Sequence, residues 1–210
     1  MIKILIADDH EMVRFGLRAI LAREFAGAHI GEAQDAHAAV ALLQQESWDL
    51  VLLDINLPGR SGLEVLRDAK TLCPKAPVLV LSAYPEEEFA LRALKLGAAA
   101  YLNKQIASSE LVAAIRKILT GGKYLTSTLA QKLADQLGEN LQQQPHESLS
   151  LRELEVLRMI ASGRSVKEIA AQLALGEATI ATYRSRIFKK MGLATNVALT
   201  RYALQHKLVE

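Results

Sequence analysis

The stretch that decides the fold runs Asp49-Leu-Val-Leu-Leu-Asp-Ile-Asn-Leu-Pro-Gly59. Its apolar run between two aspartates is typical of a strand buried on both faces of a sheet, and the proline and glycine end that run in a turn. Similar apolar runs occupy residues 2–7, 28–33, 77–82 and 100–103, and segments of helical period separate them. This alternation predicts an α/β domain built on a doubly wound, five-stranded parallel sheet.

Aspartates fall at the carboxyl ends of two predicted strands. Asp8 and Asp9 follow the first strand, and Asp54 ends the third. In a sheet of order 2-1-3-4-5 these strands are neighbours, and ligands bind in the crevice beyond their carboxyl ends. Two anions about 4 Å apart repel by roughly 4 kcal/mol at an effective dielectric of about 20, which favours a hard divalent cation such as Mg²⁺. Asp54 would then be the nucleophile that accepts a phosphoryl group as an acyl phosphate.

Two further polar residues end strands at the same edge. Lys104 follows the fifth predicted strand and Ser82 ends the fourth, so an ammonium and a hydroxyl could both meet phosphoryl oxygens. Taken singly, Asp8 and Asp9 could cap the helix that follows them. Asp54 and Lys104 could equally be a turn residue and a solvated charge. Their placement together at the ends of four strands favours a shared site.

The remainder of the chain has a different pattern. Leucines recur every fourth residue through residues 125–141, which predicts a partly helical segment, and the polar residues 142–148 are predicted to form a flexible linker. Beyond them the patterns are helical only, beginning with a capping box at Ser150 and Glu153. We therefore divide the chain into a domain over residues 1–120, a connector over 121–148 and an all-helical domain over 149–210.

Residues 165–192 predict a helix-turn-helix with Gly176 in its turn. On the second helix, Ile180, Ile187 and Met191 share an apolar face that would pack inward. Residues 149–210 hold ten lysines and arginines against five acidic residues, which favours a polyanion such as double-stranded DNA as partner. The alternative is a helical hairpin with a solvated basic face.

The first 120 residues resemble the receiver domain of bacterial two-component response regulators, whose fold is the flavodoxin-like or CheY-like sheet. The resemblance is carried by residues 49–59 and by three further stretches: Ile4-Leu-Ile-Ala-Asp-Asp-His10, Leu79-Val-Leu-Ser-Ala83 and Gly97-Ala-Ala-Ala-Tyr-Leu-Asn-Lys104. It implies that a cognate histidine kinase phosphorylates Asp54 in the presence of Mg²⁺, and that Ser82 and Tyr101 rearrange as a switch. Gln105 departs from the proline that is common in the family.

The site residues that this resemblance implies have three roles. The phosphorylated residue is Asp54. The resemblance implies that Asp9, Asp54 and the backbone carbonyl of Asn56 hold the metal, and the position of Asp8 at the end of the first strand adds it to this set. Phosphoryl binding and switching would involve Lys104, Ser82, Ala83 and Tyr101.

Residues 149–210 resemble the LuxR-type DNA-binding domain, through Leu149-Ser-Leu-Arg-Glu-Leu-Glu-Val-Leu157, Lys167-Glu-Ile-Ala170 and Ile187-Phe-Lys-Lys-Met191. A receiver joined to this domain is similar to the NarL/FixJ group of transcription regulators. The resemblance implies a phosphorylation-controlled transcription factor that binds DNA as a homodimer, with the last helix, near residues 196–206, at the dimer contact. Val197, Leu199 and Leu204 of that helix could equally be intradomain core.

The predicted DNA contacts lie mainly on the second helix of the helix-turn-helix. They are Lys167, Thr179, Ala181, Thr182, Tyr183, Arg184, Ser185, Arg186, Lys189 and Lys190. We predict that Thr182 and Ser185 contact bases, and that Arg184 and Lys189 contact phosphates. The chain departs from the family at Val166, Gly176, Ala181 and Tyr183, and the alanine replaces a lysine that would face the groove.

Other protein classes fit the sequence less well. An aspartyl phosphatase needs a second carboxylate two residues after its nucleophile, where this chain has Asn56, so we predict no enzyme activity. A nucleotide-binding module would carry a glycine-rich phosphate loop, which is absent. A regulator that binds DNA without phosphorylation stays open. No apolar run approaches about 18 residues, no signal peptide is visible, and one cysteine suits a cytoplasmic setting without a membrane partner. The five histidines are scattered, so no cysteine–histidine zinc site is predicted.

Overall fold

The structure is a computed structural model that describes every residue except 59, 139–143, 207 and 210. The chain forms two compact units, one over residues 1–141 and one over 142–210. Each unit is described by itself. None of the helices in the described part of the chain has both the length and the apolar character needed to cross a bilayer.

The first unit is built on a five-stranded parallel sheet of order β2-β1-β3-β4-β5, which confirms the predicted topology. Four strands begin one residue later than the runs that predicted them, at residues 3, 29, 50 and 78. The strands are β1 Lys3–Ala7, β2 His29–Ala33, β3 Leu50–Asp54, β4 Val78–Ser82 and β5 Ala100–Asn103. Ala7 pairs with Leu53, so β1 and β3 end side by side.

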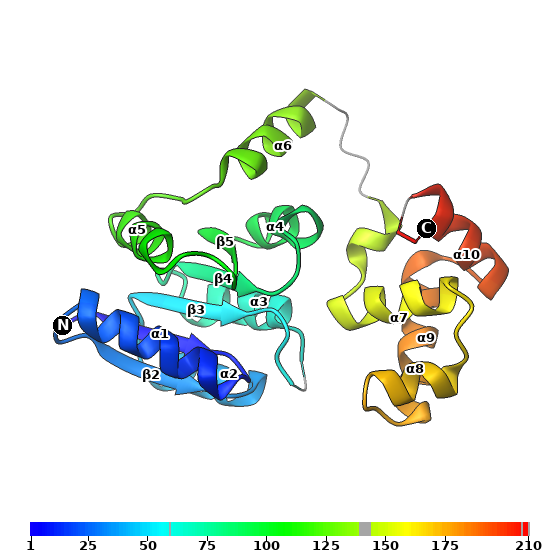
Figure 1. Ribbon diagram of the computed structural model, residues 1–210, viewed down its shortest axis with the longest axis horizontal. Coiled ribbons are helices and arrows are strands. Elements are labelled where there is room, and N and C mark those ends of the chain that lie inside the picture. Colours follow the sequence, from blue (N-terminus) through cyan, green and yellow to red (C-terminus); the bar gives the residue numbers. More distant parts are fainter. Residues whose placement is uncertain (59, 139–143, 207, 210) are drawn as a thin grey trace. The chain divides into compact units, whose positions relative to one another are not determined.

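Helices cover both faces of this sheet (Figure 1). One core cluster joins α1 and α5 to strand residues such as Ile4, Leu52 and Leu102. The alternate strand residues, such as Leu5, Leu53 and Val80, are also fully buried, because α2, α3 and α4 pack on the other face. These helices are α1 Glu11–Glu24, α2 Ala36–Gln45, α3 Gly62–Leu72, α4 Glu86–Lys95 and α5 Ser108–Leu119.

Gly62 brings the start of α3 against the backbone that carries the acidic edge. Its amide donates a 2.8 Å hydrogen bond to the carbonyl of Ile55. A Cβ at this position would lie 2.1 Å from the carbonyl oxygen of Asp54 and 2.6 Å from Cα of Ile55. Only glycine therefore permits the start of α3 to pack this closely, and the contact holds the backbone of Asp54 in position.

The connector is partly helical, as its leucine spacing predicts. Helix α6, Ser127–Gly138, packs on α4, with Leu129 buried and the Thr126 hydroxyl donating a 2.5 Å hydrogen bond to Glu86 Oε1. The polar segment 142–148 differs from the flexible linker predicted for it. Residues 142 and 143 lie outside the described residues, but Pro145–Ser148 forms a 3-10 turn, because proline favours its first position and Nδ1 of His146 lies 2.9 Å from the Tyr202 hydroxyl.

The second unit contains four α-helices within its described residues: α7 Leu151–Ala161, α8 Val166–Gln172, α9 Glu177–Met191 and α10 Asn196–Gln205. The predicted capping box at Ser150 and Glu153 starts α7, and a second, unpredicted capping box starts α8 at Ser165 and Glu168. Ile180, Ile187 and Met191 of α9 are buried, which confirms the predicted apolar face.

The turn between α8 and α9 depends on Ala174 rather than on Gly176. Ala174 has φ +52°, the only positive φ of a non-glycine residue in the described chain, whereas Gly176 has φ −75° and is the N-cap of α9. The left-handed region costs a residue with a Cβ about 1–2 kcal/mol. The turn therefore holds local backbone strain that glycine would relieve.

We expect Ala174→Gly to raise the free energy of unfolding of the second unit by about 1 kcal/mol, because glycine adopts positive φ freely. Thermal and urea unfolding of the full chain, followed by circular dichroism, measure the change. The matched control is Ala171→Gly in the exposed face of α8, where the same substitution should destabilise by about 1 kcal/mol. Equal destabilisation by both changes would contradict this account of the turn.

Candidate phosphoryl-acceptor site and nucleic-acid interface

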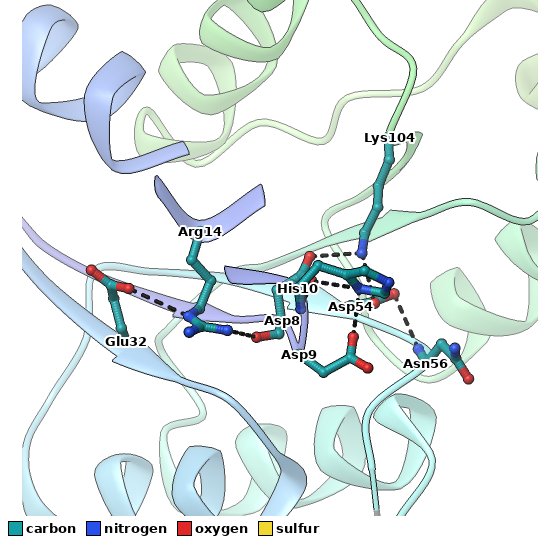
Figure 2. Close-up of polar contacts among 8 residues, drawn as sticks. All are labelled: Asp8, Asp9, His10, Arg14, Glu32, Asp54, Asn56 and Lys104. Atoms are coloured by element: carbon teal, nitrogen blue, oxygen red, sulfur yellow. Dashed lines mark hydrogen bonds and ion pairs between the residues drawn. The ribbon is translucent and has the colours of Figure 1, made fainter. Parts of the chain in front are cut away.

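The ends of three strands bring two carboxylates and an ammonium together (Figure 2). Asp8 follows β1 and Asp54 ends β3, and their side chains are almost fully buried. Lys104, which follows β5, places its Nζ atom 2.7 Å from Oδ2 of Asp8 and 2.7 Å from Oδ2 of Asp54. The lysine is therefore paired with the acidic edge and is not a solvated charge.

The burial of this ion group shifts its protonation equilibria. Burial raises the pKa of the Asp54 carboxyl above its usual value, although the Lys104 ammonium and the Asn56 amide oppose that rise. Burial alone would lower the pKa of Lys104, but the carboxylates of Asp54 and Asp8 raise it above its usual value. Lys104 is thus held cationic beside a carboxylate that is costly to ionise.

We expect Asp54→Asn to raise the free energy of unfolding at pH 7 to 8 in the absence of divalent metal. The folded state binds the Asp54 proton more tightly than the unfolded state does, since its folded pKa is raised. The stabilisation from the protonated form is complete below the unfolded pKa of about 3.9 and is lost as pH rises through the folded value. The advantage of the asparagine variant in urea unfolding should therefore shrink as pH falls toward about 4. An advantage independent of pH would contradict this assignment.

His10 joins the acidic group, although the sequence analysis gave it no role. Its Nδ1 lies 2.7 Å from Oδ1 of Asp9 and 3.3 Å from Oδ1 of Asp8. His10, and not Asp9, is the N-cap of α1, and Asp8 Oδ1 accepts the His10 amide at 2.9 Å. The capping explanation therefore does not account for Asp9. The side chain of Arg14 also binds this loop, since it donates to the carbonyl of Asp8 at 2.8 Å (Figure 2).

This arrangement fits a divalent cation. One ligand atom from each of Asp8, Asp9, His10 and Asp54 lies within 4.8 Å of the other three. Oδ1 of Asp9 is buried and accepts no hydrogen bond from the described residues, so an acceptor is left for an ion. The Asn56 amide donates to Oδ1 of Asp54 at 3.1 Å, which places the backbone of Asn56 beside the same carboxylate.

The two predicted switch residues Ser82 and Tyr101 are joined to each other by hydrogen bonds to the backbone of Tyr84. Ser82 is fully buried and its Oγ accepts the Tyr84 amide at 3.0 Å. Tyr101 is also fully buried, and its hydroxyl donates to the carbonyl of Tyr84 at 3.0 Å. Ala83, which follows Ser82 in the sequence, is exposed. Gln105 occupies the position where the family commonly has proline, and its amide donates to Oδ1 of Asn103 at 2.9 Å.

In the second unit, the residues predicted to contact DNA gather on α9. Most are exposed: Thr179, Ala181, Thr182, Ser185, Arg186, Lys189 and Lys190, together with Lys167 of α8; Tyr183 and Arg184 are half-buried. Three of them also have intradomain contacts. The Thr182 hydroxyl donates to the carbonyl of Ala178 at 2.9 Å. The Lys190 ammonium lies 2.6 Å from Oε2 of the buried Glu153, and the Arg184 guanidinium stacks over Phe188 at 5.3 Å. Arg186 and Lys189 are therefore the exposed basic residues of α9 that we expect to be available for DNA.

Three apolar residues of α10, Val197, Leu199 and Leu204, could belong either to a dimer contact or to the intradomain core. Leu199 is fully buried and packs in the unit's core. Val197 is 79% exposed and Leu204 is 52% exposed, so neither is intradomain core. These two lie seven residues apart, about two helical turns, and so share one face of the helix.

The sheet order, the acidic edge and the helix-turn-helix unit together define the class of two-domain signalling regulators. A family model described as "Response regulator receiver domain" matches residues 4–116. A second, described as "Bacterial regulatory proteins, luxR family", matches residues 147–203. The chain therefore belongs to the response regulators of the luxR family, in the predicted NarL/FixJ group. It is a transcription regulator rather than an enzyme.

Similar proteins match over nearly the whole chain. Response regulator UvrY of Escherichia coli strain K12 is 37% identical over 99% of this chain and 96% of its own length. Response regulator GacA of Pseudomonas aeruginosa is 35% identical over 100% of this chain and 99% of its own length. A solved structure of RcsB from Salmonella enterica serovar Typhimurium, bound to a promoter in the presence of the phosphomimetic BeF3−, is 27% identical, with a TM-score of 0.59 over 96% of this chain and 97% of that chain.

Proposed function

We propose that Asp54 accepts a phosphoryl group from a cognate histidine kinase and that this modification controls DNA binding by α9. The observation that carries the proposal is the contact of Lys104 with both Asp8 and Asp54, beside the carboxylate of Asp9, whose Oδ1 atom accepts no hydrogen bond from the described residues. The ammonium of Lys104 suits a phosphoryl group, and the oxygens of the three carboxylates suit a divalent cation.

In the proposed reaction, a carboxylate oxygen of Asp54 attacks phosphorus. The phosphorus–nitrogen bond of the donor phosphohistidine breaks, its electron pair stays on the nitrogen, and that nitrogen takes a proton from solvent as neutral imidazole leaves. A Mg²⁺ ion, held by Asp8, Asp9, Asp54 and the backbone carbonyl of Asn56, would offset the charge on the transferred group. The Lys104 ammonium lies 2.7 Å from Oδ2 of Asp54. From this position it would pair with the oxygens of a phosphoryl group on Asp54 as a point charge.

The proposed switch begins at Ser82. Its hydroxyl accepts the Tyr84 amide, and it would leave that bond to donate to a phosphoryl oxygen, with the adjoining Ala83 amide as a second donor. Tyr84 also accepts from the Tyr101 hydroxyl, so movement of Tyr84 would change the packing of Tyr101. Phosphorylation is thereby linked to the start of α4.

The remaining assignments follow from the family and the second unit. We assign residues 1–120 to the receiver, 121–148 to the connector and 149–210 to the DNA-binding domain, and we place the protein in the cytoplasm with its DNA. The exposed pair Val197 and Leu204 suits a homodimer contact on α10. Double-stranded DNA is the proposed partner of α9, with Thr182 and Ser185 at bases.

The phosphorylation step is tested with a small phosphodonor and Mg²⁺. The wild-type protein should incorporate phosphate that alkali or hydroxylamine releases, as an acyl phosphate does, and Asp54→Asn should incorporate none. Equal incorporation by both proteins would show that another residue is the acceptor. Measurable turnover of small phosphoesters would instead support a phosphatase, against the expectation from Asn56.

The regulatory step is tested by DNA affinity at a fixed ionic strength of about 0.15 M, since affinity for DNA depends on salt. The DNA is selected from a random pool with phosphorylated wild-type protein. Phosphodonor should strengthen binding by the wild-type protein and leave Asp54→Asn unchanged. Equal affinity of both proteins, with and without phosphodonor, would favour a regulator that binds DNA independently of phosphorylation.

A further inference from the structure

His10 takes no part in the proposed phosphoryl chemistry, yet its ring lies over the acidic site (Figure 2). As the N-cap of α1 it makes no side-chain capping hydrogen bond in the described structure. Its Nδ1 lies 2.7 Å from Oδ1 of Asp9, and that buried oxygen accepts no hydrogen bond from the described residues. The nitrogen and the oxygen therefore lie close together without hydrogen-bond alignment.

This approach has the geometry of two ligands that share one ion. Around an ion with bonds of about 2.1 Å, adjacent octahedral ligands lie about 3 Å apart and opposite ligands about 4.2 Å apart. The ligand atoms of Asp8, Asp9, His10 and Asp54 all lie within 4.8 Å of one another. Lys104 contacts the Oδ2 atoms of Asp8 and Asp54. The Oδ1 atom of each accepts one backbone amide, from His10 and from Asn56, and has a second lone pair for the ion.

We propose that His10 is a further protein ligand at this site and that it makes the site selective for first-row transition-metal ions over Mg²⁺. Imidazole nitrogen is a good ligand for Zn²⁺ and Ni²⁺, whereas Mg²⁺ takes oxygen ligands and retains water. The inference rests on the proposed function, because it uses the carboxylates assigned to Mg²⁺. The two kinds of ion would then compete for one position next to Asp54.

The first experiment uses Mn²⁺ as a paramagnetic probe bound to the full-length protein. Pulsed electron paramagnetic resonance should detect nitrogen-14 coupled to the bound Mn²⁺ in the wild-type protein. The coupling should disappear in His10→Gln and persist in His37→Gln, the matched control, because His37 is an exposed residue of α2. Absence of coupling in the wild type, or its persistence in His10→Gln, would overturn the role of His10.

The second experiment compares affinities, measured for Ni²⁺ and Mg²⁺ by displacement of Mn²⁺. Loss of one nitrogen ligand should weaken Ni²⁺ binding by roughly tenfold or more in His10→Gln, while Mg²⁺ binding changes by less than about threefold. Equal losses for the two ions would overturn the selectivity. His37→Gln should bind both ions as the wild type does.

Asp54→Asn separates failure of this inference from failure of the proposed function. If Asp54→Asn weakens Mn²⁺ binding but the wild type shows no nitrogen coupling, His10 is not a ligand and the carboxylate site stands. If the wild type and Asp54→Asn bind Mn²⁺ equally, the ion does not lie at Asp54, and both the inference and the proposed metal site are wrong.

Discussion

Gly62→Ala is expected to destabilise the first unit by about 3 kcal/mol and to reduce phosphate incorporation at Asp54 by roughly a hundredfold. The added Cβ would lie 2.1 Å from the carbonyl oxygen of Asp54 and 2.6 Å from Cα of Ile55. Both contacts are to backbone, so no flexible side chain can relieve them. Either α3 or the strand end that carries Asp54 must move. Urea unfolding and phosphodonor labelling of the full-length protein measure the two effects.

The matched control is Gly16→Ala in α1. No heavy atom lies within 4 Å of the Cβ that this change would add, apart from the helix's own backbone and chain neighbours. Alanine favours a helix interior over glycine, so this variant should gain about 0.5–1 kcal/mol and keep normal phosphate incorporation. Full incorporation by Gly62→Ala at a temperature where it is folded would mean that the α3 contact does not position Asp54.

Lys189→Met and Lys190→Met are expected to fail in different ways, although the lysines are adjacent. Lys190 lies 2.6 Å from Oε2 of Glu153, so its loss leaves a buried carboxylate without its cation. Because the Lys190 side chain is 40% exposed, solvent screening limits the expected destabilisation to about 1–2 kcal/mol. Lys189 is exposed, and its loss should instead reduce DNA affinity at all sequences and lower the salt slope by about 1.

The pH dependence of unfolding provides the control for Lys190. Burial opposes ionisation of Glu153, but Lys190 and Ser150 hold its pKa below the usual value. The resulting stability is present above the unfolded pKa of about 4.3 and is lost as pH falls through the folded value. The difference between wild type and Lys190→Met should therefore shrink in acid. A reduced salt slope in Lys190→Met with unchanged stability would assign this lysine to DNA instead.

Much of the first unit is predictable from its sequence, because the spacing of apolar residues identifies the helices and strands, and the position of polar residues at strand ends identifies the site. Strands buried on both faces are continuously apolar. A polar residue that ends such a strand therefore lies where the carboxyl ends of the parallel strands meet. Asp8, Asp54 and Lys104 are therefore placed together before any distance is known. The α9 core face is equally readable, since Ile180 and Ile187 repeat at helical spacing.

Other features depend on local geometry that no spacing encodes. The position of His10 over the acidic group follows from the rotamer of an N-cap residue, although a histidine beside two strand-end aspartates was an available signal. Ala174 adopts positive φ where the sequence offers Gly176, because it follows the C-cap of α8, and the Leu175 amide closes that helix by donating to the carbonyl of Ala170 at 2.9 Å. The 3-10 turn at Pro145–Ser148 is fixed by contacts with residues more than fifty positions away, such as Tyr202.

Helices α7 and α8 each begin with a capping box, whereas α9 begins at Gly176, which has no side chain to satisfy the amides of the first turn. Those amides and the positive end of the helix dipole suit a phosphate. A DNA phosphate bound there would accept hydrogen bonds from the first amides of the helix and so act as the missing cap. Through this linkage, DNA at a hundred times its dissociation constant would stabilise the unit by about 2.7 kcal/mol.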